Sequence, residues 1–211
     1  DYTYAHTALC LDFLGISEHN HFSSTNNPGM LLPLYAQGLQ QAQAYTNAHP
    51  GFVALFGMEW GVISNGGHVV LYGIDSLIGW ETLSTGNNYD IYVAKSDYQG
   101  PNGLFQKIVD RRSSNAFATL AHPNSSDYGN MLYGTYNVIA DSAVVGVAVE
   151  SGPAFSTDTT YSDAPSAMSY LPFYMQALAK GYHVGPTIDH DNHYTTFGKT
   201  NGSRLAILAT N

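Results

Sequence analysis

The chain has 211 residues, 44% of them hydrophobic, so it can bury a core and is not globally disordered. Its formal net charge is -9 with only seven Lys and Arg, which excludes the basic stripe of a nucleic-acid-binding surface. No apolar run approaches the roughly 20 residues of a membrane helix. The single Cys excludes an intramolecular disulfide and a thiolate-rich zinc site.

Short apolar runs alternate with helical stretches along the chain. In chain order, the pattern predicts a strand at Asp12–Ser17, a helix at Leu31–Asn47, strands at Phe52–Met58 and His68–Gly73, a helix at Pro101–Ser113, strands at Ala116–Ala121 and Val144–Val149, a helix at Pro165–Lys180, and strands at His183–Ile188 and Arg204–Ala209. This alternation is typical of parallel β-sheet built from βαβ units, either an open doubly wound sheet or a closed barrel.

Imidazole and carboxylate side chains follow five of these runs, at their carboxyl ends. They are Glu18 and His19, Glu59, His122, Glu150, and the group Asp189, His190, Asp191 and His193. Taken singly, such a residue is more often a cap or a solvated loop residue. Because the carboxyl ends of parallel strands share one face, five ends with the same chemistry favour a common site. Imidazole and carboxylate together are ligands for Zn, Mn or Fe.

Other features leave alternatives open. Either His19 or His21 can be the ligand of its segment, with the other on the surface. His68 begins a strand instead of ending one, so by itself it is interpreted as a structural residue. Asp191 and His193 lie two apart, so on an extended backbone both side chains reach one ion. The chain has no G-x-S-x-G elbow and no phosphate-binding P-loop.

Six segments resemble, in order, motifs of the PHP family, the polymerase and histidinol phosphatase domain. They are LDFLGISEHNH at 11–21, Gly57-Met58-Glu59, Gly67–Gly73, Leu120–Pro123, Gly146–Glu150 and Asp191-Asn192-His193. The resemblance extends from about Tyr4 to Ala209. It implies that residues 1–211 form a single PHP-like hydrolase domain.

The resemblance implies an α/β fold, a distorted seven-stranded β/α barrel similar to a TIM barrel, with two or three divalent ions at the strand ends. It implies hydrolysis of a phosphoester of a small molecule. Carried over by motif, the metal ligands are His19, Glu59, His68, His122, Asp191 and His193. Glu59 would bridge two ions, and with His122 and Asp191 it would be catalytic. Behind the ligands or facing the substrate would lie Glu18 and Glu150.

Cations for a phosphate group are scarce, and Lys199 and Arg204 are the best candidates because they follow the Asp191–His193 segment. The family also begins with an H-x-H motif on its first strand, which this chain lacks. The resemblance therefore implies a barrel that is incomplete at the N-terminus, and a chain that also stops early at the C-terminus, so that the activity of this chain by itself is open. Low Lys with many Tyr, Asn and Ser suits a protein exported from a bacterial cell, with the cytoplasm as the alternative.

Two other functions stay open. The same metals can activate water against an amide or ester instead of a phosphoester. Alternatively, the chain is a non-catalytic module that binds a glycan through Tyr-rich loops. The candidate tyrosines are Tyr89, Tyr92, Tyr98, Tyr128, Tyr133 and Tyr136.

Overall fold

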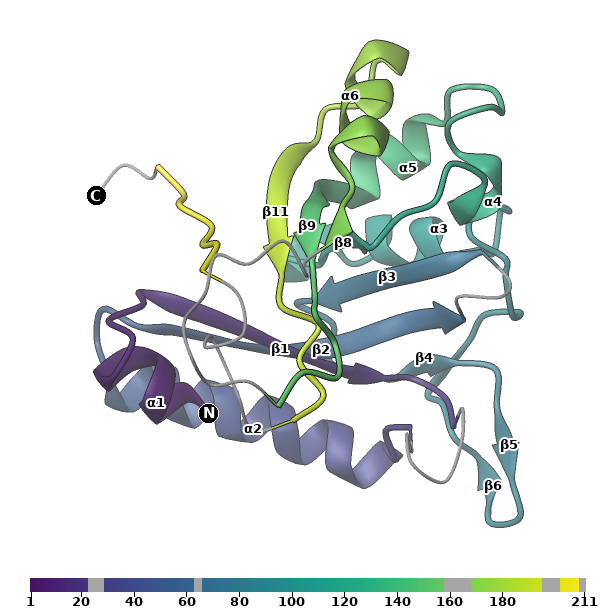
Figure 1. Ribbon diagram of the computed structural model, residues 1–211. Coiled ribbons are helices and arrows are strands. Elements are labelled where there is room, and N and C mark those ends of the chain that lie inside the picture. Colours follow the sequence, from purple (N-terminus) through teal and green to yellow (C-terminus); the bar gives the residue numbers. More distant parts are fainter. Residues whose placement is uncertain (23–28, 63–65, 158–167, 195–201, 209–211) are drawn as a thin grey trace.

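The computed structural model describes residues 1–22, 29–62, 66–157, 168–194 and 202–208. Within them one seven-stranded sheet runs in the order β1–β2–β3–β8–β9, with both β10 and β11 paired to β9. The sheet is curled into a half-barrel with helices packed against it, so the fold is mixed α/β (Figure 1). Its strands are β1 (Phe13–His19), β2 (Val53–Val62), β3 (Gly67–Tyr72), β8 (Phe117–Ala121), β9 (Val144–Ser151), β10 (Met168–Ser169) and β11 (Gly185–Asp189).

Helices precede the parallel strands of the sheet. They are α1 (Tyr2–Thr7), α2 (Leu32–Ala48), α3 (Leu104–Val109), α4 (Asp127–Asn130), α5 (Val138–Ala143) and α6 (Leu171–Lys180). The connection from β1 through α2 to β2 is a βαβ unit, since β1 and β2 are parallel. The expected helix at Leu31–Asn47 is confirmed to within one residue at each end, with Pro33 in its first turn.

The expectation of a wholly parallel sheet is wrong for β3, which is antiparallel to both β2 and β8. Only residues 63–66 separate β2 from β3. A parallel crossover needs roughly a dozen residues or more, so this short connection forces the chain to turn back. The amino end of β3 therefore lies at the same edge of the sheet as the carboxyl ends of β2 and β8.

Two predicted segments end differently in the structure. The expected helix at Pro101–Ser113 is reduced to α3, followed by a 3₁₀ turn at Arg112–Ser114. The expected helix from Pro165 begins only at Leu171, after the short strand β10, and residues 165–167 lie outside the described residues. Its first turn contains Pro172, and Pro is tolerated there but would break a helix interior.

The strand expected at Arg204–Ala209 is also wrong for the described residues 202–208, which have no regular secondary structure. Leu208 is fully exposed, and an apolar run without a neighbouring strand gains no ladder hydrogen bonds.

Residues 73–103, between β3 and α3, form an excursion that the sequence did not predict. It carries two small sheets, one of β4 (Ile78–Gly79) and β7 (Ile91–Tyr92), the other of β5 (Thr82–Leu83) and β6 (Gly86–Asn87). The excursion packs its apolar side chains into the main core, where Leu77, Ile78 and Tyr98 join Trp60 of β2. None of the described helices combines the length and apolar character needed to cross a bilayer.

Candidate metal centre

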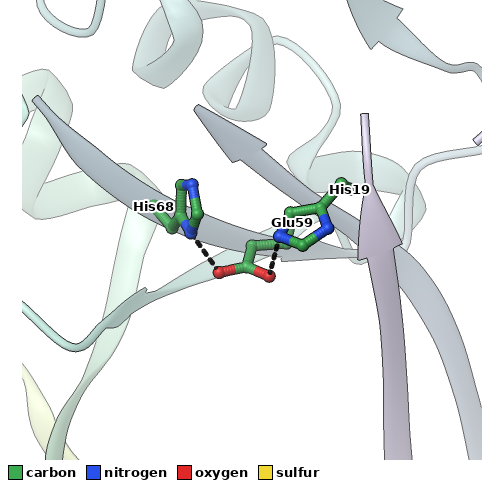
Figure 2. A group of neighbouring side chains, drawn as sticks. All are labelled: His19, Glu59 and His68. Carbon is green, nitrogen blue, oxygen red and sulfur yellow. Dashed lines mark ion pairs between the residues drawn. The ribbon is translucent and has the colours of Figure 1, made fainter. Parts of the chain in front are cut away.

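Glu59, near the carboxyl end of β2, lies at the centre of three imidazoles. Its Oε1 is 2.5 Å from His68 Nδ1 and 3.2 Å from His122 Nε2. Its Oε2 is 3.3 Å from His19 Nε2. Figure 2 shows His19 and His68 on either side of the carboxylate. One oxygen of Glu59 therefore faces two imidazoles and the other oxygen faces a third.

Strand register positions these side chains. His19 is the last residue of β1 and lies opposite Glu59 in the parallel β1–β2 pair. His68 lies opposite Gly61 on one side and Ala121 on the other, so the antiparallel direction of β3 brings it to the edge where the other ligands end. His122 directly follows β8. Neighbouring strands are about 4.8 Å apart, close enough for side chains on one face to meet.

The backbone is constrained at several of these positions. Gly67 has a φ of +87°, and a Cβ there would lie 2.8 Å from the Asp127 carboxyl carbon, so a glycine is required just before His68. His122 and Asp191 have φ values of 31° and 48°, in the left-handed region that side chains rarely adopt. Such local strain is typical of functional sites, where the surrounding fold holds it in place.

The cluster keeps Glu59 ionised. Burial alone would raise the pKa of Glu59, but hydrogen bonds from His122 and His68 outweigh burial and hold the pKa well below its usual range. Burial by itself would lower the pKa of His122, but the hydrogen bond to Glu59 and the charge of Glu59 outweigh burial and raise this pKa. Burial lowers the pKa of His19 in spite of the same carboxylate. A deprotonated carboxylate and neutral imidazoles are the forms that bind a metal ion.

Asp191 and His193 approach this cluster from the segment after β11. The His193 ring centroid is 5.6 Å from that of His19. His193 Nδ1 is 2.9 Å from the Asp191 carbonyl oxygen, to which it donates a hydrogen bond, so Nε2 is the ring nitrogen left for a metal ion. Burial and then the charge of Glu59 raise the pKa of Asp191. The Asp191 and His193 side chains are 20% and 21% exposed, against 10% for Glu59, so the cluster opens toward them.

Of the six residues expected as ligands, the structure thus brings His19, His68 and His122 into contact with Glu59, and it places His193 beside His19 and Asp191 within electrostatic range of Glu59. It also adds Asp189, the last residue of β11. Burial, followed by the charge of Glu59, raises the pKa of Asp189 to about 7. Its Oδ2 has no hydrogen-bond partner among the described residues. The sequence pattern placed Asp189 at a strand end together with Asp191, but it did not single Asp189 out as a residue that interacts with Glu59.

The remaining predicted residues lie around the cluster. Glu150 Oε2 accepts a 2.7 Å hydrogen bond from Ser203 Oγ. Arg204 Nη1 is 3.4 Å from His190 Nε2, which places this cation beside the Asp191 segment. Glu18 is exposed on β1, within electrostatic range of His193. Lys199 lies outside the described residues.

Two other sequence interpretations need correction. Tyr98 and Tyr128 are 1% and 0% exposed, so they belong to the core and not to a glycan-binding rim. His21 is not a surface residue: it is 6% exposed and its ring stacks on Trp80 at 5.2 Å, while His19 is the imidazole that faces Glu59.

Asn20 is a supporting residue that sequence reasoning missed. It is fully buried, its Oδ1 accepts from the Gly61 N–H at 3.2 Å, and its Nδ2 donates to the Ile78 carbonyl at 3.3 Å. It therefore ties the end of β1 to β2 and to the excursion. Its place directly after His19, in Glu18-His19-Asn20, was the available signal.

The donor set fits a divalent ion. Ligand atoms of His19, Glu59 and His68 all lie within 4.8 Å of one another. Two ligands of one tetrahedral zinc, each about 2.0–2.1 Å from it, are roughly 3.3–3.4 Å apart. The 3.2 Å and 3.3 Å distances from Glu59 to His122 and His19 are close to that spacing, whereas His68 Nδ1, at 2.5 Å from Glu59 Oε1, is closer than two ligands of one zinc would be.

No protein-family model matches the chain, and the search of curated proteins finds no similar sequence. The resemblance to the PHP family therefore rests on the six motifs alone, and the metal centre rests on the geometry of Glu59 and the side chains around it.

Proposed function

We propose that this protein is a metal-dependent phosphoesterase of the PHP type. The main support is the geometry of Glu59, whose two oxygens face different imidazoles within a buried pocket of side chains. A carboxylate in this position is suited to bridge two ions. Two-metal sites with His and carboxylate ligands recur in enzymes that hydrolyse phosphoesters.

The proposed ligands are His19, Glu59, His68, His122, Asp191 and His193. Bound there, divalent ions such as Zn, Mn or Fe would lower the pKa of water and neutralise charge on phosphoryl oxygens. The hydrogen bond from His193 Nδ1 to the Asp191 carbonyl fixes the orientation of the imidazole ring, so that Nε2 would be the nitrogen that binds the metal ion.

The chain's own residues would hold the substrate and move protons. Asp191 is the carboxylate nearer the open side, so it would orient the attacking water and accept its proton. Arg204 lies next to His190, and its guanidinium group would bind the phosphoryl oxygens of the substrate. Glu59 lies deeper than Asp191 and would act as a metal ligand.

We extend this proposal to the fold. β1 and β11 lie far apart in the order of the sheet, yet the His19 and His193 rings at their ends are 5.6 Å apart. This convergence supports a distorted β/α barrel in which the described sheet is the main wall, with residues 1–211 as one domain.

The proposal is tested with p-nitrophenyl phosphate, after removal of metals with a chelator and addition of Mn²⁺, Zn²⁺ or Mg²⁺ in turn. We expect hydrolysis that depends on the added metal and is lost in Glu59→Gln. Glu81→Gln is the matched control, because Glu81 accepts from the Phe22 N–H, a bond that Gln keeps. Metal-dependent hydrolysis of p-nitrophenyl acetate but not of the phosphate would instead favour a hydrolase of non-phosphate bonds. No turnover of any ester would favour a binding module.

A further inference from the structure

The loop after β9 places an aromatic ring beside the metal centre. Two backbone hydrogen bonds attach this loop to the segment that carries the ligands: His193 N–H donates to the Ala154 carbonyl at 3.0 Å, and Gly152 N–H donates to the Asp189 carbonyl at 3.1 Å. The ring of Phe155 consequently lies against that of His193, with centroids 4.4 Å apart and planes at 38°. Phe155 is thus held in a fixed position next to a proposed ligand.

This ring is open to solvent. Phe155 is 65% exposed, and the neighbouring Tyr194, 6.4 Å away and edge-on, is 48% exposed. Together they form an exposed aromatic surface beside His193. An exposed apolar surface next to a group of convergent polar residues is the usual composition of a small-molecule site.

The charge around the site limits the substrate. Of the Lys and Arg side chains that the structure describes, Arg204 lies next to the segment that carries Asp191, with its Nη1 3.4 Å from His190 Nε2. Arg111 instead donates to the Lys107 carbonyl of α3, and Lys180, at the end of α6, donates to the Leu132 carbonyl. With Arg204 as the cation that the described residues place beside this segment, and a net charge of -9, the site suits a single phosphoryl group better than a polyphosphate chain.

We propose that Phe155 determines specificity by stacking on a flat aromatic ring in the leaving group of a phosphomonoester. The phosphoryl group would lie at the cluster around Glu59, and the ring would cover the exposed face of Phe155. This inference rests on the proposed function and narrows its substrate class to aryl, benzyl or nucleoside-like monoesters.

Binding is tested first, by titration calorimetry of the Mn²⁺-loaded protein with benzylphosphonate and with methylphosphonate, neither of which can be hydrolysed at a P–O ester bond. We expect benzylphosphonate to bind about tenfold more tightly, which corresponds to roughly 1.4 kcal/mol and lies within the range for aromatic pairs. The preference should disappear in Phe155→Ala and return in Phe155→Tyr.

Tyr133→Ala is the matched control. Tyr133 has the same 65% exposure as Phe155. It precedes Gly134, whose carbonyl accepts a hydrogen bond from Lys180 at the end of α6, shortly before the amino end of β11, whereas His193 follows the carboxyl end of that strand. This variant should keep the tenfold preference. Equal binding of the two phosphonates by the wild type, or a preference unchanged by Phe155→Ala, overturns the inference.

Turnover separates this inference from the proposed function. In Phe155→Ala, KM for benzyl phosphate should rise about tenfold, while kcat/KM for glycerol phosphate, which has no ring, changes less than about twofold. If both substrates are hydrolysed and Phe155→Ala changes neither KM nor kcat/KM, the aromatic subsite is contradicted but the proposed function is not. Absence of turnover and of phosphonate binding contradicts the proposed function as well.

Discussion

His19 ends β1 and His193 follows β11, two strands far apart in the order of the sheet, yet their rings lie 5.6 Å apart. Among the described residues β1 pairs with β2, and β11 pairs with β9, so no ladder joins the two strands directly. The curl of the sheet brings their carboxyl ends together. This curvature places His193 next to His19, which is itself a neighbour of Glu59, although the two histidines are 174 positions apart in the sequence.

Replacing Glu59 with Gln should greatly weaken metal binding. Gln keeps the size of the side chain but removes the negative charge that faces three imidazoles. We expect the affinity for Zn²⁺ or Mn²⁺, measured by titration calorimetry, to fall by more than the roughly 10–100-fold typical of an outer-shell partner. Glu81→Gln should bind metal like the wild type. Equal affinity of Glu59→Gln and the wild type would place the ion elsewhere.

The stability of the metal-free protein should depend on Asp189. Its pKa is about 7 in the folded state, against 3.8 for the free side chain. Because the folded pKa is raised, the stabilisation from protonated Asp189 is complete below pH 3.8 and is lost as the pH rises through about 7.

Asp189→Asn resembles the protonated side chain at every pH. Relative to the wild type, it should therefore gain a few kcal/mol of unfolding free energy between pH 5 and pH 8, at roughly 1.4 kcal/mol per pKa unit. Urea unfolding in the presence of a chelator measures this difference. The exposed Asp12→Asn serves as the control. If the difference in unfolding free energy between Asp189→Asn and the wild type is the same at pH 5 and at pH 8, the raised pKa of Asp189 is contradicted.

Removing the Asn20 amide should destabilise the fold and disturb His19. Asn20→Ala leaves the Gly61 N–H and the Ile78 carbonyl without their side-chain partner in a buried region. We expect the unfolding free energy to fall by roughly 2–4 kcal/mol. Gln43→Ala, on the exposed face of α2, should change it by less than about 0.5 kcal/mol. A loss for Asn20→Ala as small as that of the control would show that the excursion is held by other contacts.

Much of the sheet could be predicted because its strands are continuous apolar runs. The predicted strand Phe52–Met58 begins one residue before β2, and Val144–Val149 lies within β9; both β2 and β9 continue a few residues further than predicted. The positions of His19, Glu59 and His122 at strand ends followed from the same pattern. The antiparallel direction of β3 could not be predicted from composition. Because of this direction, His68, which the sequence suggested was a structural residue, lies next to Glu59.

The remaining parts of the fold depend on tertiary contacts and could not be predicted from local sequence. The excursion 73–103 contains strands of only two residues, too short for any periodicity to be recognised. The run Arg204–Ala209 has the composition of a strand, but its described residues have no neighbouring strand to pair with. The burial of Asp189 and the openness of Phe155 depend on how two loops meet, and local sequence carries no signal for that.

The most direct measurement is anomalous diffraction from crystals of the protein grown with Zn²⁺. An anomalous peak is predicted within roughly 2.0–2.2 Å of Glu59 and of His19 Nε2 or His68 Nδ1. The same peak should be absent from crystals of Glu59→Gln. Peaks confined to other histidines, such as His6 and His49 near the amino end of β2, with none at Glu59, would contradict the assignment of this cluster as a metal centre.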